Sequence, residues 1–291
     1  SGWMLMGVPG LAYTTGISGL WIAVGLTLGT WANWKFVSRR LRNHTEVASD
    51  SLTLPDYLKN RFHDQSHSVA VISALFILIF FLIYTSSGFV AGGKLFNTIF
   101  GLDYTLSLFI TAGIVVFYTF LGGFLAVSWT DCIQGALMFF AILAVPITAA
   151  MYLGGPIETM QLIQSEFPQG LNLFGDTSDM FALIIGIISS LGWGLGYFGQ
   201  PHILVRFMAI SDAKELKKST NIAMVWVILS LLAAIFVGLI GNVYMLPERL
   251  VGTDAETIFL VMTERLFTPF VAGLIWSAVL AAIMSTASAQ L

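Results

Sequence analysis

The chain has 291 residues, of which 57% are apolar and only 10% are charged. Soluble globular domains carry about 25% charged residues, and a water-soluble core of this size could not bury so much apolar surface. The composition therefore excludes a soluble enzyme and a disordered chain. Because 13 Lys and Arg stand against 16 Asp and Glu, the chain also has no basic excess for binding nucleic acid. The lipid bilayer remains as its expected surroundings.

Apolar stretches of about 20 residues, the length that a membrane-spanning helix needs, recur along the chain. Their apolar residues are continuous rather than alternating, which favours helices over strands. The predicted fold class is therefore an all-α integral membrane protein. We predict a half-length piece at 3–14 and seven full spans at 17–36, 69–91, 106–125, 132–153, 180–209, 222–245 and 267–291.

The Lys and Arg residues divide unevenly between the predicted loops. If the loop 35–67 lies inside the cell, alternate crossings also place 122–131 and 206–220 inside. Ten cations then lie inside and three outside, which agrees with the positive-inside rule and predicts a multi-pass protein of the inner (plasma) membrane. The inner ten are Lys35, Arg39, Arg40, Arg42, Lys59, Arg61, Arg206, Lys214, Lys217 and Lys218, and the outer three are Lys94, Arg249 and Arg265.

Two of the predicted spans look interrupted. The first interruption covers 1–10, which includes Gly7, Pro9 and Gly10, and the second covers 192–201, with four glycines and one proline. Gly and Pro weaken a helix, and backbone freed at membrane depth must find partners in protein or in a water-filled cavity. Transporters with inverted repeats use such paired interruptions as a binding site. The alternative is close helix packing by small residues.

Aromatic side chains accompany the second interruption. Trp193, Tyr197 and Pro201 are four residues apart and share one face if the backbone stays close to helical. Such a stripe suits a small amphipathic ligand, although it can equally be a ridge that faces the bundle. Tyr84 carries a polar hydroxyl within an apolar run. It is either a candidate ligand-binding residue or a core tyrosine whose hydroxyl bonds to a carbonyl.

The last span and one acid provide candidate ion ligands. Ala282, Ser285 and Thr286 share one helix face, so a carbonyl and two hydroxyls could offer oxygen ligands to a hard cation such as sodium. The alternative is that both hydroxyls bond back to carbonyls of the preceding turn. Asp131, at the inner mouth of a span, is either a functional acid or the N-cap of the next helix.

Four motifs together resemble the sodium/solute symporter family: residues 1–10 (SGWMLMGVPG), 121–131 (LGGFLAVSWTD), 192–204 (GWGLGYFGQPHIL) and 281–286 (AAIMST). The resemblance implies a five-plus-five inverted-repeat bundle with broken helices. By this resemblance 1–291 is a single transmembrane transporter domain that begins inside the first core helix and stops within the eighth. We therefore expect it to be truncated at both ends.

The resemblance also implies a function and assigns roles to residues. The expected activity is sodium-coupled symport of L-proline into the cell by alternating access, without enzymatic chemistry. Alternatives are a same-family symporter for another small solute, a solute sensor that does not transport, and a membrane-embedded enzyme. Ser1, Gly2, Trp3, Tyr84, Trp193, Tyr197 and Pro201 match substrate-binding positions, Ala282, Ser285 and Thr286 match sodium ligands, and Asp131 matches an acid on the inner sodium path.

Overall fold

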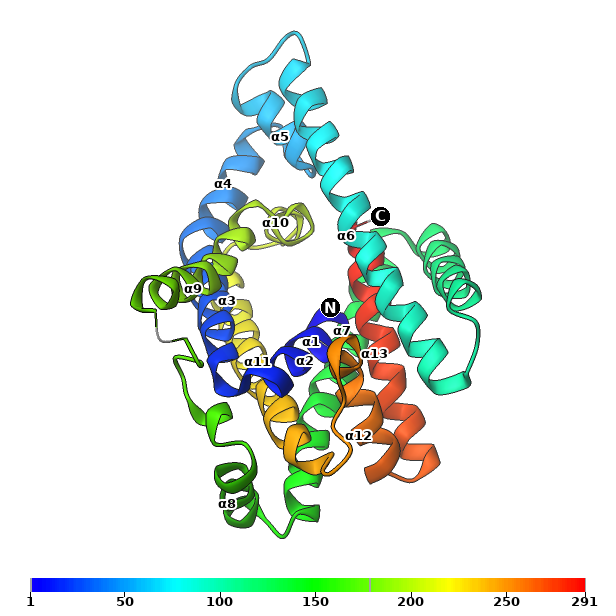
Figure 1. Cartoon of the computed structure of the whole chain (residues 1–291). Coiled ribbons are helices and arrows are strands. Elements are labelled where there is room, and N and C mark those ends of the chain that lie inside the picture. Colours follow the sequence, from blue (N-terminus) through cyan, green and yellow to red (C-terminus); the bar gives the residue numbers. More distant parts are fainter. Residues whose placement is uncertain (1, 178, 291) are drawn as a thin grey trace. The chain divides into compact units, whose positions relative to one another are not determined.

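The computed structural model describes residues 2–177 and 179–290, apart from the side chains of residues 122, 125 and 126 (Figure 1). Within these residues every regular element is a helix. The helices include seven candidate membrane spans, which confirms the predicted all-α membrane fold. The spans are Gly2–Val47, Ser68–Phe100, Tyr104–Leu121, Val127–Tyr152, Met180–Gly199, Leu216–Tyr244 and Pro269–Gln290.

The chain divides into two compact units. Unit 1 comprises Ser1–Leu20, Thr85–Leu183 and Leu229–Leu291, and unit 2 comprises Trp21–Tyr84 and Ile184–Ile228. Each unit is therefore assembled from segments that are distant in sequence. The two predicted interruptions fall into different units, the first into unit 1 and the second into unit 2.

Unit 1 is built around two long helices, α7 (Tyr104–Tyr152) and α13 (Pro269–Gln290), which pack along each other. Their apolar side chains, such as Ile142 and Ile283, are fully buried in one core cluster. Around them lie the second half of α6 (Ser68–Phe100), the second half of α11 (Leu216–Tyr244), α1 (Gly2–Leu5), α2 (Gly7–Thr15), η1 (Gly16–Gly19), α8 (Pro156–Glu166), η3 (Pro168–Leu171), η5 (Gly252–Thr257) and α12 (Ile258–Leu266).

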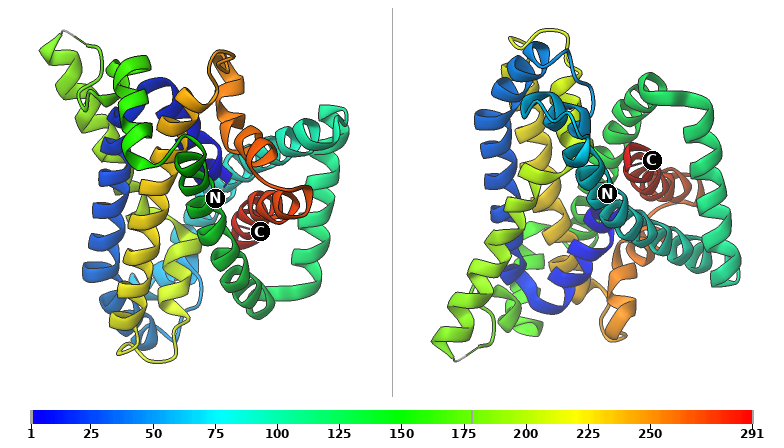
Figure 2. Two further views of the ribbon diagram at one scale, coloured as in Figure 1. Left: turned by 90° about the horizontal axis from the view of Figure 1, so that it is seen from below. Right: turned by 90° about the horizontal axis from the view of Figure 1, so that it is seen from above.

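The connection inside α7 is shorter than predicted. We expected a loop over 122–131, whereas the chain leaves helical geometry only at Gly123, with φ 60° and ψ −175°. Glycine adopts this positive φ without steric cost, so one residue can turn the chain sharply between two spans (Figure 2). The Tyr118 and Thr130 hydroxyls share a short hydrogen bond across the turn.

Unit 2 contains α3 (Leu20–Ala32) from Trp21 on, the π-helical turn η2 (Asn33–Ser38), α4 (Arg39–Val47), α5 (Leu54–Arg61), α9 (Met180–Gly192) from Ile184 on, η4 (Trp193–Gly199) and α10 (Pro201–Met208). The first halves of α6 and α11 complete it. Its own small core joins Leu41 of α4 to Phe207 and Met208 of α10. The helical segment that we expected to end near residue 36 runs on through η2 to residue 47, so the inner loop begins later than predicted.

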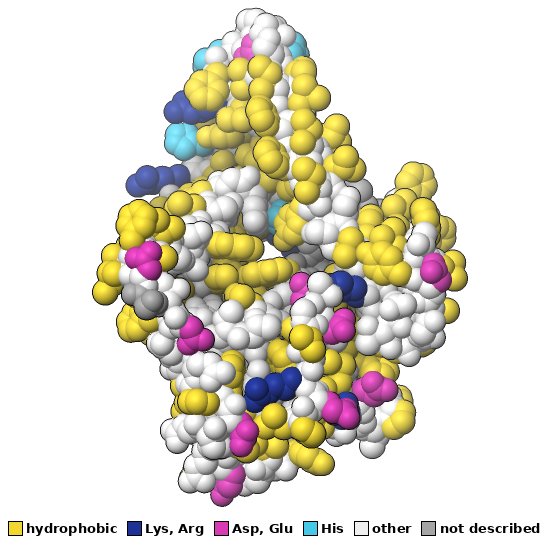
Figure 3. All heavy atoms as spheres, in the orientation of Figure 1, with side chains coloured by type: hydrophobic (Ala, Val, Ile, Leu, Met, Phe, Trp, Pro, Cys, Tyr) yellow, Lys and Arg dark blue, Asp and Glu magenta, His cyan; other side chains and the backbone are white. Residues whose placement is uncertain are grey.

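Apolar side chains are exposed along the spans as well as buried between them. On α6, Leu78 and Leu82 are 65% and 69% exposed, and Figure 3 shows such side chains covering the helix. Monomeric soluble proteins rarely expose apolar patches of this extent. These faces are therefore suited to contact with lipid tails.

Candidate functional site

The first interruption is a kink at a single residue of unit 1. Met6 separates α1 from α2, with φ −123° and ψ −58°. Pro9 explains the position, because it has no N–H to donate to the Leu5 carbonyl and its ring would clash with that carbonyl. The ladder resumes at once, since the Gly10 N–H donates to the Met6 carbonyl at 2.9 Å.

The structure corrects the extent of this interruption. Gly2 and Trp3 lie in the short helix α1, not in an unwound stretch, and Ser1 lies outside the described residues. A Cβ at Gly2 would lie 3.0 Å from Ile283 of α13, so glycine lets α1 lie directly against α13. Trp3 lies over Gly7, where a Cβ would come within 2.6 Å of the indole ring.

The candidate sodium ligands form one compact turn of α13. Ser285 Oγ and Thr286 Oγ1 both donate to the Ala282 carbonyl oxygen, at 3.2 and 3.0 Å. This is the back-bonded arrangement that we kept as an alternative. It does not exclude ion binding, because a hydroxyl that donates its proton keeps lone pairs for a cation. Ala282 is buried and both hydroxyl residues are half-buried.

The second interruption extends over a longer stretch of unit 2. Between α9 and α10 the chain forms the 3₁₀ helix η4, followed by Gln200 in an extended conformation and Pro201 at the first position of α10. This confirms the predicted break. It also changes the expected aromatic stripe, because a 3₁₀ helix has about three residues per turn. Residues four apart are then rotated by about 120°, so Trp193 and Tyr197 do not share one face.

The glycines of this region divide into two groups. Gly194 packs backbone to backbone against α3, since a Cβ there would lie 2.0 Å from the Gly25 carbonyl oxygen. Gly192 and Gly199 have nothing among the described residues within 4 Å of a built Cβ, and Gly196 has only the Gln200 amide at 3.8 Å. Close packing therefore accounts for Gly194 but not for the other three.

Asn33 supports the broken segment and was missed by the sequence reasoning. Its side chain, 1% exposed, donates from Nδ2 to the Tyr197 carbonyl oxygen at 2.9 Å. A 3₁₀ helix satisfies its carbonyls less well than an α-helix, so a buried amide donor stabilises this geometry. The sequence does contain an indication of this role, because Asn33 is a lone asparagine within the apolar run before Lys35.

Tyr84 lies at the far end of the second interruption. Its ring centroid is 6.3 Å from that of His202, and Phe81 lies 5.5 Å from the same imidazole. His202 directly follows Pro201, so the structure brings Tyr84 to the start of α10. Trp193 is 51% exposed, whereas Tyr84, Tyr197 and Pro201 are half-buried.

Asp131 lies within a helix rather than at its start. It follows the Gly123 turn by two helical turns and is half-buried, so the alternative of an N-cap is wrong. Its helix α7 packs along α13, which carries the candidate sodium ligands.

Comparison with known proteins decides the family. The sodium:solute symporter family model matches residues 1–291. The chain belongs to this family. The described residues include seven helical segments long and apolar enough to cross a membrane, so this member of the family is a multi-pass plasma-membrane protein, as predicted.

Two relatives of this family illustrate the similarity. The high-affinity proline transporter PutP of Bacillus subtilis is 51% identical over all of this chain, which covers 60% of that relative. Sodium/proline symporter 2 of Staphylococcus saprophyticus is 49% identical over all of this chain, which covers 56% of it. The chain thus spans somewhat more than half the length of the curated relatives it matches.

A solved structure agrees with the fold. The substrate-bound outward-open state of a Na⁺-coupled sialic acid symporter matches all of this chain and 61% of its own, with a TM-score of 0.76 and 20% sequence identity. This match confirms the transporter fold that the sequence motifs implied.

Proposed function

We propose that this protein takes part in sodium-coupled symport of L-proline into the cell. The observation that carries the proposal is the identity of about one half, over the whole chain, to relatives named as proline transporters. Membership of the sodium:solute symporter family supports sodium as the coupling ion. In this proposal 1–291 acts as one transmembrane transporter domain without enzymatic activity.

Sodium is proposed to bind at the α13 turn. A hard cation prefers oxygen ligands, and the Ala282 carbonyl with the Ser285 and Thr286 hydroxyls supplies three within one turn. The half-buried Asp131 on the neighbouring α7 is assigned to the inner path of the ion, because a carboxylate in a low-dielectric region attracts a cation strongly.

Proline is proposed to bind at the two interruptions. An aromatic wall suits its apolar ring, and polar groups exposed by broken helices suit its charged ends. The open space beside three of the four glycines in 192–199 supports this role over packing alone. The proposed residues are Ser1, Gly2, Trp3, Tyr84, Trp193, Tyr197 and Pro201.

Coupling is proposed to run through the contact between α1 and α13. Gly2 packs on Ile283, the residue next to the proposed ligand Ala282, so an ion at this turn changes the surface on which α1 rests. The kink at Met6 lets α1 change direction separately from α2. For sodium to drive transport, it must bind the transport-competent state better than the other state.

The test is uptake of labelled L-proline by reconstituted vesicles. An inward sodium gradient should drive accumulation, and an equal potassium gradient, as matched control, should not. Binding of proline without accumulation would indicate a sensor. Stronger competition by another amino acid, a betaine or a vitamin would reassign the solute.

A further inference from the structure

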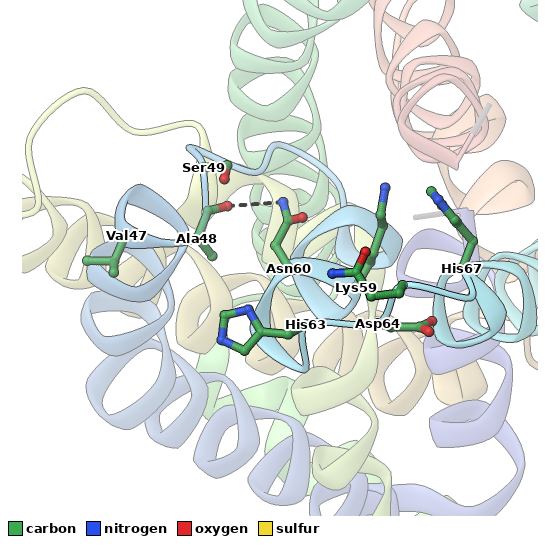
Figure 4. A pocket seen from close by; sticks show the side chains of 9 residues that line it. Val47, Ala48, Ser49, Lys59, Asn60, His63, Asp64 and His67 are labelled. Atoms are coloured by element: carbon green, nitrogen blue, oxygen red, sulfur yellow. Dashed lines mark hydrogen bonds between the residues drawn. The ribbon is translucent and has the colours of Figure 1, made fainter.

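An open polar hollow of about 290 Å³ lies in unit 2, where the inner loop connects α4 to α6. Its walls come from the end of α4 and from the end of α5 with the turn that follows (Figure 4). The Asn60 amide donates to the Ala48 carbonyl at 3.2 Å and to Ser51 Oγ at 2.9 Å, so it joins the two walls. The hollow exceeds the ~30 Å³ of one water several-fold, which leaves room for a small polar group.

The acids around this hollow already have donors. Glu46 and Asp50 both pair with the largely buried Arg42, at 3.0 and 3.2 Å. Asp64, the acid in the wall, accepts hydrogen bonds from Ser66 and from the Val69 N–H. These bonds, that from the Ser66 hydroxyl above all, lower the pKa of Asp64, so its negative charge is stabilised within its own turn.

Among the described residues the basic side chains of the wall are not held by such bonds, although the charge of Asp64 interacts with His67. Lys59, His63 and His67 line the hollow, and within the described part of the chain none of them has an ion pair or a hydrogen bond through its side chain. Figure 4 shows Lys59 and His67 on one side of Asn60 and His63 on the other. The walls therefore offer the charged ammonium of Lys59 and the N–H groups of two imidazoles around a polar space, in a loop that the distribution of Lys and Arg places in the cytoplasm.

We propose that this hollow binds the phosphate group of an anionic ligand. Phosphate accepts several hydrogen bonds at once, which matches a charged lysine ammonium and two imidazole N–H groups around a polar space. Ser49 and Gln65 add neutral donors to the same walls. The proposal concerns a site separate from the transport residues and does not depend on the transported solute.

Two sources can supply such a phosphate: a free cytoplasmic anion or an anionic phospholipid of the inner leaflet. Apolar side chains near the hollow suit a lipid: Val47, at the end of a candidate membrane span, is 88% exposed, and Phe62, beside the lining residue His63, is 67% exposed. Basic pockets on the cytoplasmic side of membrane helices bind lipid headgroups in this way. The experiment below separates the two sources.

The test compares Lys59→Gln with Arg61→Gln in the purified full chain. Both substitutions remove one positive charge from α5, but only Lys59 lines the hollow. Native mass spectrometry would count retained phosphatidylglycerol against phosphatidylcholine, and calorimetric titration would measure inorganic phosphate. We expect Lys59→Gln to weaken binding about tenfold, as for one charge-assisted hydrogen bond, and Arg61→Gln to leave it nearly unchanged.

Each outcome decides the proposal. Selective loss of phosphatidylglycerol in Lys59→Gln supports a lipid site, and selective loss of inorganic phosphate supports a soluble ligand. His67→Gln should reproduce the loss in either case. Equal losses in Lys59→Gln and Arg61→Gln, or no binding of either probe by the unsubstituted chain, would overturn the proposal.

Discussion

The two interrupted helices differ in how the chain accommodates the break. In unit 1 the break is one residue, Met6, and the hydrogen-bond ladder resumes at once. In unit 2 it is the seven-residue 3₁₀ segment Trp193–Gly199, supported by the amide of Asn33 and by backbone contact at Gly194. A proline one turn after Met6 is thus accompanied by a kink, whereas four closely spaced glycines with support from α3 and Asn33 accompany a longer opened segment. The kink at Met6 suits a hinge, and the 3₁₀ segment η4 suits a binding surface.

The largest effect should come from Gly194→Ala. A Cβ would lie 2.0 Å from the Gly25 carbonyl oxygen, so α3 and η4 must separate. Overpacking of side chains costs about 1–3 kcal/mol, and a clash with backbone relaxes less easily. We expect a severe loss of folded protein, measured by fluorescence-detected size-exclusion chromatography.

Gly196→Ala is the matched control for that change. A Cβ there meets only the Gln200 amide at 3.8 Å, so the amount of folded protein should stay near that of the parent. Equal losses in both variants would show that backbone contact at Gly194 does not explain the stability of η4.

A second prediction concerns the aromatic wall. Trp193→Ala should raise the proline KM about tenfold or more, because it removes a large aromatic surface proposed to contact the apolar ring of proline, and it should leave the sodium requirement unchanged. Labelled-proline uptake at varied proline and sodium measures both. Leu195→Ala, a 72% exposed side chain of the same 3₁₀ helix, is the control and should change neither. A normal KM in Trp193→Ala would remove this residue from the site.

A third prediction compares two buried asparagines that support carbonyls in different units. Asn33 donates to Tyr197 at 2.9 Å, and Asn242 donates to Tyr13 at 2.8 Å. Replacing either by Ala should cost about 1–3 kcal/mol, since a buried acceptor loses its donor.

Only Asn33→Ala should also raise the proline KM, because it alone supports the proposed binding segment. Thermal unfolding and uptake kinetics check the two effects separately. The same KM in both variants would show that η4 does not need the asparagine to bind solute.

The smallest effect should follow from breaking the ion pair between Lys94 and Glu256, which links α6 to η5 in unit 1. The side chains are 29% and 47% exposed, so the pair contributes about 0–1 kcal/mol after screening by solvent. Lys94→Gln should lower the unfolding temperature slightly at low salt and not at high salt. A large loss that persists at high salt would contradict a solvent-screened pair.

The sequence predicted the spans and both breaks because lipid imposes a simple rule: about 20 apolar residues per helix, interrupted where Gly and Pro gather. It did not predict where a break would end. Gly2 and Trp3 stay helical because Pro9 acts only on the Leu5 carbonyl, and Trp193 and Tyr197 lose their common face because η4 is a 3₁₀ helix.

The remaining differences depend on contacts distant in sequence. The donor role of Asn33 requires η2 to lie beside η4, and no local pattern specifies that. The position of Asp131 within a helix was not predicted, because we expected a loop to end there. The chain instead turns at Gly123 alone and is helical again well before Asp131. The Ala282, Ser285 and Thr286 turn followed from helix spacing alone, because its bonds are all local.

The most direct measurement of the central claim is the sodium concentration that gives half-maximal proline uptake. Ser285→Ala and Thr286→Ala should each raise it about tenfold or more, as expected when a cation loses one oxygen ligand. Ser277→Ala is the matched control, because Ser277 makes the same kind of bond to a carbonyl, 2.6 Å to Leu274, on an exposed face of the same helix. The account predicts an unchanged sodium requirement in that control. An unchanged requirement in both Ser285→Ala and Thr286→Ala would contradict it.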